Sequence, residues 1–307
     1  MDRREFLKTV SKILIAVGGA HFFTYEELLA LEHGEIQKPD LIWIHAMSCD
    51  GCTTSLLNSE VPMLDILIKF TNIIFHPTIM SATGEDALKI LKEYKSNNLI
   101  MVVEGSIPLD MPHACVMGER FIEDWVYEIA KKSNLAIAAG TCAVFNGITE
   151  MDNMKTGVCT LRYFLKKKKI KIPLVNLPTC PMKPHHFLYM LFYYIKHKTT
   201  PPLDMENRPL IFFENTIHER CVYYYDFQEK IFAKKIGDRG CLLELGCQGP
   251  VTKSDCVKSE GHFDRFNCIK SGHPCVGCGS ENFPRKIIFK RSDDKRVLEK
   301  YKKFKRI

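Results

Sequence analysis

The segment that decides the fold of the chain reads IHERC (217–221), GCLLELGCQGP (240–250), CVKS (256–259) and NCIKSGHPCVGC (267–278). It contains seven cysteines and, three residues before the first of them, His218. Thiolate is the ligand that iron–sulfur clusters require, and each 4Fe–4S cubane takes four ligands. Seven cysteines and one histidine therefore match two clusters.

Disulfides and zinc explain these cysteines less well. An odd total of 13 cysteines in 307 residues argues against a small domain stapled by disulfides. A zinc ribbon needs two C-x-x-C pairs about 15 to 20 residues apart. The two pairs present, Cys49/Cys52 and Cys275/Cys278, are more than 200 residues apart. Zinc bound in the C-terminal part alone stays compatible with the spacing.

The positive charge of the chain is concentrated at its C-terminal end. The net charge is +7, and residues 285–307 alone carry eleven Lys or Arg against three acidic residues, which leaves the remainder close to neutral. A nucleic-acid-binding domain would carry basic residues as a face of its folded body, so nucleic acid is not an expected partner. The tail is either a solvated surface or a site that docks to an acidic redox partner or to anionic lipid.

The N-terminus begins with DRREFLK (2–8), followed by the apolar run Ile13–Ala20. Arg3 and Arg4 ahead of Phe6 resemble a twin-arginine export signal, a route that carries folded, cofactor-loaded proteins. An amphipathic helix that starts with two arginines is the alternative. No A-x-A cleavage site stands out, which favours retention of the segment. No apolar run approaches the roughly 20 residues that a membrane-spanning helix needs.

After Pro39 the pattern changes to short apolar runs separated by amphipathic segments such as Asp86–Tyr94 and Gly118–Lys131. Five runs read as buried strands. They are Leu41–Met47, Asn72–His76, Leu99–Val103, Leu135–Ala139 and Pro173–Asn176. This alternation predicts a parallel sheet with helices on both faces. The ligand site of such a sheet lies beyond the carboxyl ends of its strands.

Four further cysteines directly follow three of these strands. They are Cys49 and Cys52 in MSCDGCTTS, Cys142 in AGTCAVFNG and Cys180 in NLPTCP. Because their loops share one rim of the sheet, the four thiols can converge on one cluster. Gly51 and Gly140 would let the backbone turn tightly around the sulfides and leave amides free to hydrogen-bond them.

The turn after the first strand also argues against a nucleotide. A dinucleotide site needs a G-x-G-x-x-G turn at this place, and here the turn carries two cysteines. A P-loop lysine motif is likewise absent from the sequence. The sheet is therefore expected to hold metal.

Several blocks, in their order, resemble the small, electron-transferring subunit of nickel–iron hydrogenases. The resemblance spans residues 40–284 and rests on CDGC, HPTIM, VEGSIP, GTCA, NLPTCP, IHERC, LGCQGPVT and GHPCVGC. It implies an α/β fold, with a flavodoxin-like parallel-sheet domain followed by a smaller, loop-rich iron–sulfur domain. The domain boundaries are 1–38 for a twin-arginine-type signal segment, 39–200 for the flavodoxin-like domain, 201–284 for the iron–sulfur domain and 285–307 for the basic tail.

The resemblance implies ligands for three iron–sulfur clusters. The proximal 4Fe–4S cluster, nearest the nickel–iron site, would take Cys49, Cys52, Cys142 and Cys180. The distal 4Fe–4S cluster, at the exit surface, would take His218, Cys221, Cys241 and Cys247, with a neutral imidazole replacing one thiolate. The medial cluster between them would take Cys256, Cys268, Cys275 and Cys278. No residue of this chain is expected to be catalytic or to bind nickel.

Two departures from the family pattern carry information. Many relatives have proline in place of Cys268 and hold a 3Fe–4S medial cluster. With Cys268 as a ligand, we expect a medial 4Fe–4S cluster of lower potential, as in the nickel–iron–selenium branch; without it, the medial cluster would be 3Fe–4S. Gly51 and Gly147 stand where oxygen-tolerant relatives carry two extra cysteines, so the proximal cluster is expected to be a plain cubane.

Several residues stay outside these ligand sets. Cys115 and Cys159 are expected to be structural. Glu104, which follows the third strand on the cysteine-bearing rim, would accept hydrogen bonds near the cluster or face the large subunit. No second ligand at metal spacing accompanies the remaining histidines considered, His45, His113 and His262.

The function implied by the resemblance is electron relay during reversible hydrogen oxidation. Hydrogen would be split or made in a nickel–iron large subunit, and electrons would pass through this chain to an external acceptor such as a cytochrome. A large apolar interface centred on the MSCDGC and VEGSIP loops would cover the proximal rim. The complex would be periplasmic, with any membrane association peripheral and made through a partner or a retained N-terminal segment.

Three other functions fit part of the pattern. A stand-alone ferredoxin-like carrier would not need an extended rim awaiting a partner. A cluster-bearing subunit of a respiratory or deazaflavin-reducing complex would share the first domain but generally lacks the His218 motif. A zinc-stabilised scaffold would contain far fewer than the roughly 12 iron atoms of three cubanes.

Overall fold

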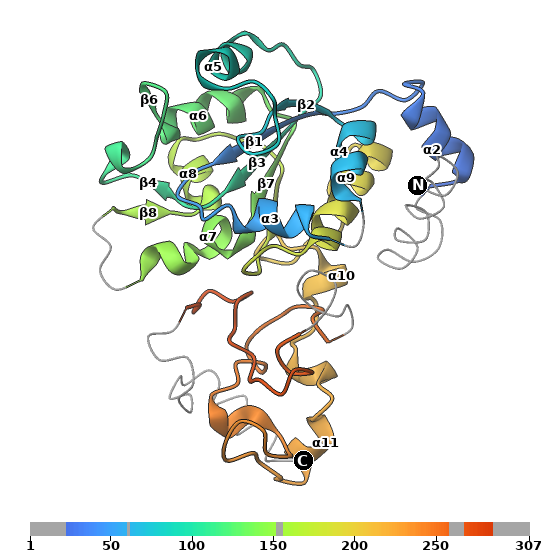
Figure 1. The fold of residues 1–307 in the computed structure, drawn as a ribbon, viewed down its shortest axis with the longest axis vertical. Helices are drawn as coiled ribbons and strands as arrows, with labels where there is room; N and C mark the ends of the chain where they lie inside the picture. The colour runs from blue at the N-terminus through green and yellow to red at the C-terminus, as the bar shows by residue number, and fades with distance from the viewer. Residues whose placement is uncertain (1–22, 60–61, 152–155, 258–266, 285–307) are drawn as a thin grey trace.

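The computed structural model describes residues 23–59, 62–151, 156–257 and 267–284. The arginine pair of the N-terminal segment, His262 and the basic tail 285–307 lie outside these described residues. A sheet with flanking helices is followed by a smaller, loop-rich part that lies beyond one end of the sheet (Figure 1). Among the helices of the described ranges, none combines the length and the apolar character needed to cross a bilayer.

The central sheet has five parallel strands in the order β2-β1-β3-β7-β9. They are β1 (Asp40–His45), β2 (Asn72–Phe75), β3 (Leu99–Glu104), β7 (Leu135–Ala139) and β9 (Leu174–Leu177). Counted along the chain, this is the flavodoxin-like order 2-1-3-4-5 of doubly wound folds. The predicted fold class and all five predicted strands are confirmed, with strand ends shifted by at most two residues.

Helices cover both faces of the sheet (Figure 1). One face carries α2 (Tyr25–Glu32), α4 (Met63–Phe70) and α9 (Pro184–His197), and the other carries α5 (Gly84–Glu93), α6 (Ile122–Lys132) and α8 (Leu161–Lys167). Successive strand side chains point to opposite faces. Leu41 and Trp43 therefore pack in the first core, and Ile42 and Ile44 in the second. Burial on both faces explains why the strands read as continuous apolar runs.

The predicted helix Gly118–Lys131 begins later than expected, at Ile122. A short hairpin occupies the preceding residues, formed by β5 (Val116–Met117) and β6 (Arg120–Phe121). Gly118 makes its turn with φ of +63°, a conformation that a glycine adopts without strain. A second small antiparallel pair joins β4 (Ile107–Pro108) to β8 (Val158–Cys159).

Helix α9 is apolar on nearly all sides, since eleven of its fourteen residues are buried. A helix of this kind belongs in an interior, and each fully buried Leu or Phe contributes about 1.5–3 kcal/mol. Leu188, Leu191 and Phe192 pack in the sheet core. The first turn of α9 is different, because Lys183, His185 and His186 contact the loop-rich part.

Two short helices start where strands end, α3 (Gly51–Leu57) after β1 and α7 (Gly140–Phe145) after β7. The loop-rich part contains α10 (Leu210–Phe213), η3 (His218–Arg220), α11 (Tyr224–Gln228) and η4 (Leu242–Leu245). Its own small core includes Ile217, Ala233, Leu242 and Ile269, together with Cys247 and Cys275. The Thr141 hydroxyl in α7 donates to the Cys278 carbonyl and so connects the two parts.

Candidate metal centres

The carboxyl ends of β1, β7 and β9 bring together four cysteines, here called the rim group. They are Cys49 just before α3, Cys52 in the first turn of α3, Cys142 in α7 and Cys180 after β9. The pKa of Cys180 is raised to about 11, first by burial and then by the negative charges of Cys142 and Cys49. Burial also raises the pKa of Cys52, and the charges of Cys180 and Cys142 raise it further. Thiols that perturb one another in this way lie close together.

Glycines keep the space around the rim sulfurs open. A Cβ at Gly51 would lie 3.0 Å from Cys49 Sγ, and a Cβ at Gly140 would collide with Cys52 Sγ. Gly140 also has φ of +82°, which disfavours any other residue. The Met182 N–H donates to Cys52 Sγ at 3.3 Å. These features suit a bulky inorganic group whose sulfur ligands need hydrogen bonds.

Glu104 ends β3 and is buried beside the rim group. Its carboxylate accepts the N–H groups of Cys52 and Thr53, each at 3.1 Å, the Thr53 hydroxyl at 2.8 Å and Trp43 Nε1–H at 3.2 Å. Burial alone would raise the pKa of Glu104, but His45 and the donors from Thr53 and Cys52 lower it overall. The ionised carboxylate therefore satisfies the first N–H groups of α3 and fixes the CDGC loop.

Replacing Glu104 with glutamine is expected to destabilise the protein. The amide nitrogen of glutamine would face at least one of the donors that now meet a carboxylate oxygen, and losing a hydrogen bond to a charged group costs about 1.5–3 kcal/mol. A clear fall in the thermal unfolding temperature of the purified protein would follow. Glu128→Gln is the matched control, because Glu128 forms an exposed pair with Arg120 and such pairs contribute about 0–1 kcal/mol. Equal effects of the two changes would contradict this role of Glu104.

The expectation that His45 has no second ligand group beside it is wrong. Its Nε2 lies 3.4 Å from Asp50 Oδ1 and 3.3 Å from Glu104 Oε2, so the three groups are within metal-ligand reach of one another. The strand register pairs His45 with Glu104, a neighbour that lies far away in the sequence. His113, in contrast, is exposed in the short 3-10 helix η1 (Pro112–Ala114).

The loop-rich part holds a second set, here called the histidine group: His218, Cys221, Cys241 and Cys247. The pKa of Cys241 is raised to about 12 by burial and by the charges of Cys247 and Cys221. His218 is only 6% exposed, and its ring meets Phe227 edge-on with centroids 4.5 Å apart. A Cβ at Gly249 would lie 3.4 Å from Cys247 Sγ and 3.5 Å from the backbone nitrogen of His218. His218 and Cys247 are therefore neighbours.

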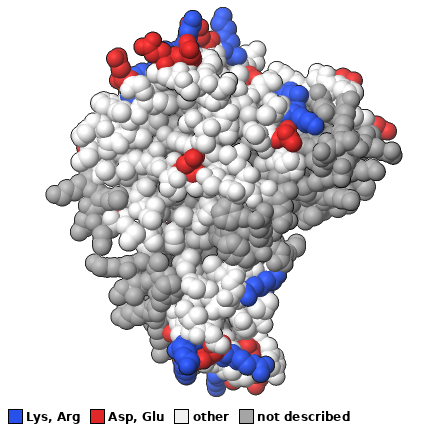
Figure 2. Space-filling model, viewed as in Figure 1, with Lys and Arg blue, Asp and Glu red and all other residues white. Residues whose placement is uncertain are grey.

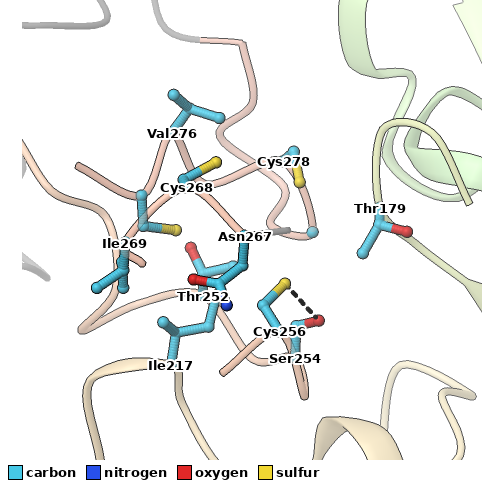
Figure 3. Close-up of a pocket in the computed structure, with 12 residues that line it drawn as sticks. Thr179, Ile217, Thr252, Ser254, Cys256, Asn267, Cys268, Ile269, Val276 and Cys278 are labelled. Carbon is cyan, nitrogen blue, oxygen red and sulfur yellow. Dashed lines mark hydrogen bonds between the residues drawn. The ribbon is translucent and has the colours of Figure 1, made fainter. Parts of the chain in front are cut away.

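A third set lines a pocket between the other two and is here called the pocket group: Cys256, Cys268, Cys275 and Cys278. Figure 3 shows the Sγ atoms of Cys256, Cys268 and Cys278 directed into the same space. The pocket has a volume of about 400 Å³, part of which opens to solvent. Burial raises the pKa of Cys268, and the charge of Cys256 raises it further. Cys268 thus lies with the other three thiols.

Contacts between the sets place them in a row. The backbone N–H of Cys180, in the rim group, hydrogen-bonds to the Cys278 thiol of the pocket group. The N–H of Cys275 donates to Cys247 Sγ, in the histidine group, at 3.3 Å. The pocket group therefore touches both of the others. Each set offers four donors of the type that a 4Fe–4S cluster takes, so the side chains present fit three such clusters.

Two cysteines stay apart from these sets. Cys159 is buried in β8 and Cys115 is half-buried, and both pack against the core under α5, α6 and α8. Burial is the first cause of the raised pKa of each thiol. Their surroundings are those of ordinary core residues.

Two family models match the chain. Residues 49–194 match the model described as NADH ubiquinone oxidoreductase, 20 Kd subunit. Residues 213–290 match the model that describes the C-terminal part of the NiFe/NiFeSe hydrogenase small subunit. Together the two matches include all three sets of side chains described above.

Similar full-length proteins and solved structures point the same way. The chain is 32% identical over 305 residues to the periplasmic NiFeSe hydrogenase small subunit of Desulfomicrobium baculatum, covering 92% of this chain and 96% of that protein. It is 33% identical over 293 residues to the periplasmic NiFe hydrogenase small subunit 1 of Nitratidesulfovibrio vulgaris, covering 92% and 90%. The crystal structure of a reduced, active Ni-Fe-Se hydrogenase from Desulfomicrobium baculatum superposes with a TM-score of 0.77 at 32% identity, covering 83% of this chain and 100% of that chain.

Proposed function

Because the chain belongs to the family of nickel–iron and nickel–iron–selenium hydrogenase small subunits, we propose that it relays electrons through three iron–sulfur clusters. The clusters would connect the nickel–iron site of a large subunit with an external acceptor, such as a cytochrome, during reversible hydrogen oxidation. The observation that carries the proposal is the row of contacts from Cys180 to Cys278 and from Cys275 to Cys247. Small subunits of this family pair with a large subunit and form part of an oxidoreductase.

The three sets of side chains take the three ligand roles in this proposal. The proximal 4Fe–4S cluster binds to the rim group, the medial 4Fe–4S cluster to the pocket group and the distal 4Fe–4S cluster to the histidine group. Gly147, with φ of +52°, keeps Cys142 uncrowded, since a Cβ there would lie 3.1 Å from Cys142 Sγ. This agrees with a plain proximal cubane held by four thiolates.

Bound clusters supply reversible one-electron transfer, and the chain controls where and at what potential it occurs. Each set includes at least one buried cysteine, which would shield that side of its cluster from water: Cys52 in the rim group, Cys241 and Cys247 in the histidine group, and Cys275 and Cys278 in the pocket group. Backbone N–H groups of Met182, Tyr223 and Gly249 donate to Cys52, Cys221 and Cys247 Sγ at 3.3, 3.4 and 3.4 Å. Such hydrogen bonds stabilise the more negative, reduced state. Because the imidazole of His218 is a neutral ligand, the histidine group carries one negative charge fewer than four thiolates would. This lowers the negative charge around the distal cluster, from which electrons would leave the chain.

Replacing Cys268 with alanine is expected to convert the medial cluster from 4Fe–4S to 3Fe–4S. Cys268 offers the fourth thiolate of the pocket group, and a cubane that lacks one ligand loses that iron. Electron paramagnetic resonance of the oxidised variant should show a strong 3Fe–4S signal that the unaltered complex lacks. A strong 3Fe–4S signal in intact, unaltered protein would instead mean that Cys268 is not a ligand. Cys115→Ala, at a cysteine outside the three sets, should leave the spectrum unchanged.

The large subunit would cover the rim group. Cys49 is exposed, and the flanking Leu57 and Ile148 are 41% and 49% exposed. Figure 2 shows charged side chains gathered toward the two ends of the pictured face and, among the described residues, few between them. The placing of MSCDGC and VEGSIP at the centre of this interface stays a prediction; the side chains of residues 103–108 are buried within the chain itself.

Cellular placement is part of the proposal. Relatives named periplasmic support export, and the paired Arg3 and Arg4 support the twin-arginine route. The domain boundaries predicted at residues 38, 200 and 284, peripheral membrane association and a cytochrome acceptor stay predictions. Fractionation of cells that produce the complex would test the location.

Purification of the native complex tests the proposed function. A nickel-containing large chain should co-purify, and the small chain should contribute about 12 iron atoms, as three cubanes require. The complex should reduce an artificial electron acceptor under hydrogen. Isolation of the chain alone with full iron content would favour a ferredoxin-like carrier. Zinc in place of iron would favour a structural scaffold.

A further inference from the structure

Four ionisable side chains form a buried cluster between the first turn of α9 and the loop before Cys256. They are Lys183, His185, His186 and Asp255, all less than 10% exposed. The Asp255 carboxylate accepts Lys183 Nζ–H at 2.6 Å and lies 2.7 Å from His185 Nε2 and 2.9 Å from His186 Nε2. Charged groups are seldom buried unless something specific balances them. Neither the ligand sets nor the electron path described above assigns a role to this cluster.

The contacts within the cluster are those of an ion pair. Lys183 Nζ lies 2.6 Å from Asp255 Oδ1, and the two side chains are only 0% and 6% exposed. Lysine and aspartate are almost never fully buried unless they are paired, and a bond of this length is typical of an ammonium that donates to a carboxylate. The cluster therefore contains an ammonium paired with a carboxylate.

A bound metal ion is a poor explanation of this cluster. His185, His186 and Asp255 lie within ligand reach of one another. The ammonium of Lys183, however, contacts Asp255 Oδ1, the same oxygen that His186 approaches. A cation placed on this oxygen would meet the ammonium charge at close range with little screening. The ammonium already provides the positive charge that the carboxylate needs.

Lys183 makes a second contact that points to a function. Its side chain hydrogen-bonds to Cys256 of the pocket group, in addition to Asp255. Its charge also acts on the Cys268 thiol. Ser254 Oγ lies 3.4 Å from Cys256 Sγ, the contact drawn in Figure 3. A buried cation is thus held against the sulfur of one pocket-group ligand and near a second.

We propose that Lys183 raises the reduction potential of the medial cluster, with Asp255, His185 and His186 holding its ammonium against Cys256. This inference rests on the proposed function, because it concerns the cluster that the pocket group would bind. Reduction adds one negative charge to a cluster, and a cation that donates to a ligand sulfur stabilises the reduced state. The low dielectric of the interior strengthens this effect.

The proposal gives the cluster a place in the relay. A fourth thiolate from Cys268 adds negative charge to the medial cluster and lowers its reduction potential. The ammonium of Lys183 opposes this change from within the same pocket. The negative charge of Asp255 reduces the effect of the ammonium in part. The Asp255 carboxylate is shared among Lys183, His185 and His186. The Lys183 ammonium, in contrast, hydrogen-bonds directly to Cys256.

Redox titration of the purified heterodimer, followed by electron paramagnetic resonance, tests the proposal. Lys183→Met removes the cation and keeps a side chain of similar length. The oxidation equilibrium of the medial cluster should shift at least tenfold toward the oxidised state. For a one-electron couple, a tenfold shift lowers the reduction potential by ~59 mV. The medial potential should fall more than those of the proximal and distal clusters. Lys183→Gln, which can still donate to Cys256, should give a smaller shift.

Lys183→Met alone leaves the buried Asp255 carboxylate without its cation and can therefore destabilise the fold. A double variant avoids this problem. Lys183→Met with Asp255→Asn removes both charges, and its medial potential should still lie below that of the unaltered complex. Lys196→Met is the control, since Lys196 lies at the other end of α9 in a surface pair with Glu27. It should shift no potential.

The outcomes separate this inference from the proposed function. Intact signals from three clusters with an unchanged medial potential in both Lys183 variants would overturn the role of Lys183 alone. An equal fall in all three potentials would also overturn it, because a contact with Cys256 acts locally. Absence of any medial cluster signal from the unaltered complex would overturn the proposed function and this inference together.

Discussion

Replacing Cys49 with serine is expected to remove the proximal cluster while leaving the fold of the chain intact. Cys49 is the exposed member of the rim group, so its thiol contributes little to packing. The purified complex should contain about four iron atoms fewer, the content of one cubane. Hydrogen-dependent reduction of an external acceptor should fall by more than about 100-fold, because loss of a supporting residue alone commonly costs 10–100-fold. Iron analysis and acceptor reduction under hydrogen measure both effects.

The control for this change is Cys115→Ser, which alters a half-buried cysteine packed under α6, away from the three sets. Iron content and acceptor reduction should then match those of the unaltered complex. Thermal unfolding of both variants separates loss of a cluster from loss of the fold. A Cys49→Ser complex with full iron content and normal electron delivery would exclude Cys49 as a ligand, and with it the assignment of the rim group.

The sheet was predictable because its signal is local. Strands buried on both faces need apolar side chains at every position, and LIWI at 41–44 and LAIAA at 135–139 satisfy this need over short runs. The start of α6 was less predictable. The residues 116–121 have enough helical character to extend the amphipathic pattern, but the hairpin around Gly118 uses them instead. The flavodoxin-like order of the strands came from the family resemblance.

The grouping of the cysteines was partly predictable for a related reason. Parallel strands end on the same edge, so Cys49, Cys142 and Cys180 could be expected to meet before any contact was known. Contacts between the two parts of the chain gave no such signal. Lys183 and Asp255 are 72 residues apart, and neither belongs to a periodic pattern. The available hints were the sequence KPHH (183–186), which begins three residues after Cys180, and the acidic residue directly before Cys256.

Replacing His218 with alanine is expected to slow electron exit and to spare hydrogen activation in the partner subunit. The distal cluster would lose its imidazole ligand at the end of the relay. Hydrogen-dependent reduction of external acceptors should fall at least about tenfold. Hydrogen–deuterium exchange at the metal site of the large subunit does not require electrons to leave through the distal cluster and should stay largely unchanged. Parallel assays of the two reactions on one preparation give the comparison.

The surroundings of His218 make a second variant necessary. Its ring is buried against Phe227 and Tyr224, at centroid distances of 4.5 and 5.3 Å, so alanine leaves a cavity as well as a missing ligand. His218→Cys also removes the ring but offers a thiolate, and it should retain the iron of the distal cluster. If both variants lose exchange and acceptor reduction to the same extent, His218 supports the packing around η3. The two changes open similar cavities and differ in whether a metal ligand is present. If His218→Cys retains the iron of the distal cluster and His218→Ala loses it, the imidazole of His218 is therefore identified as a ligand.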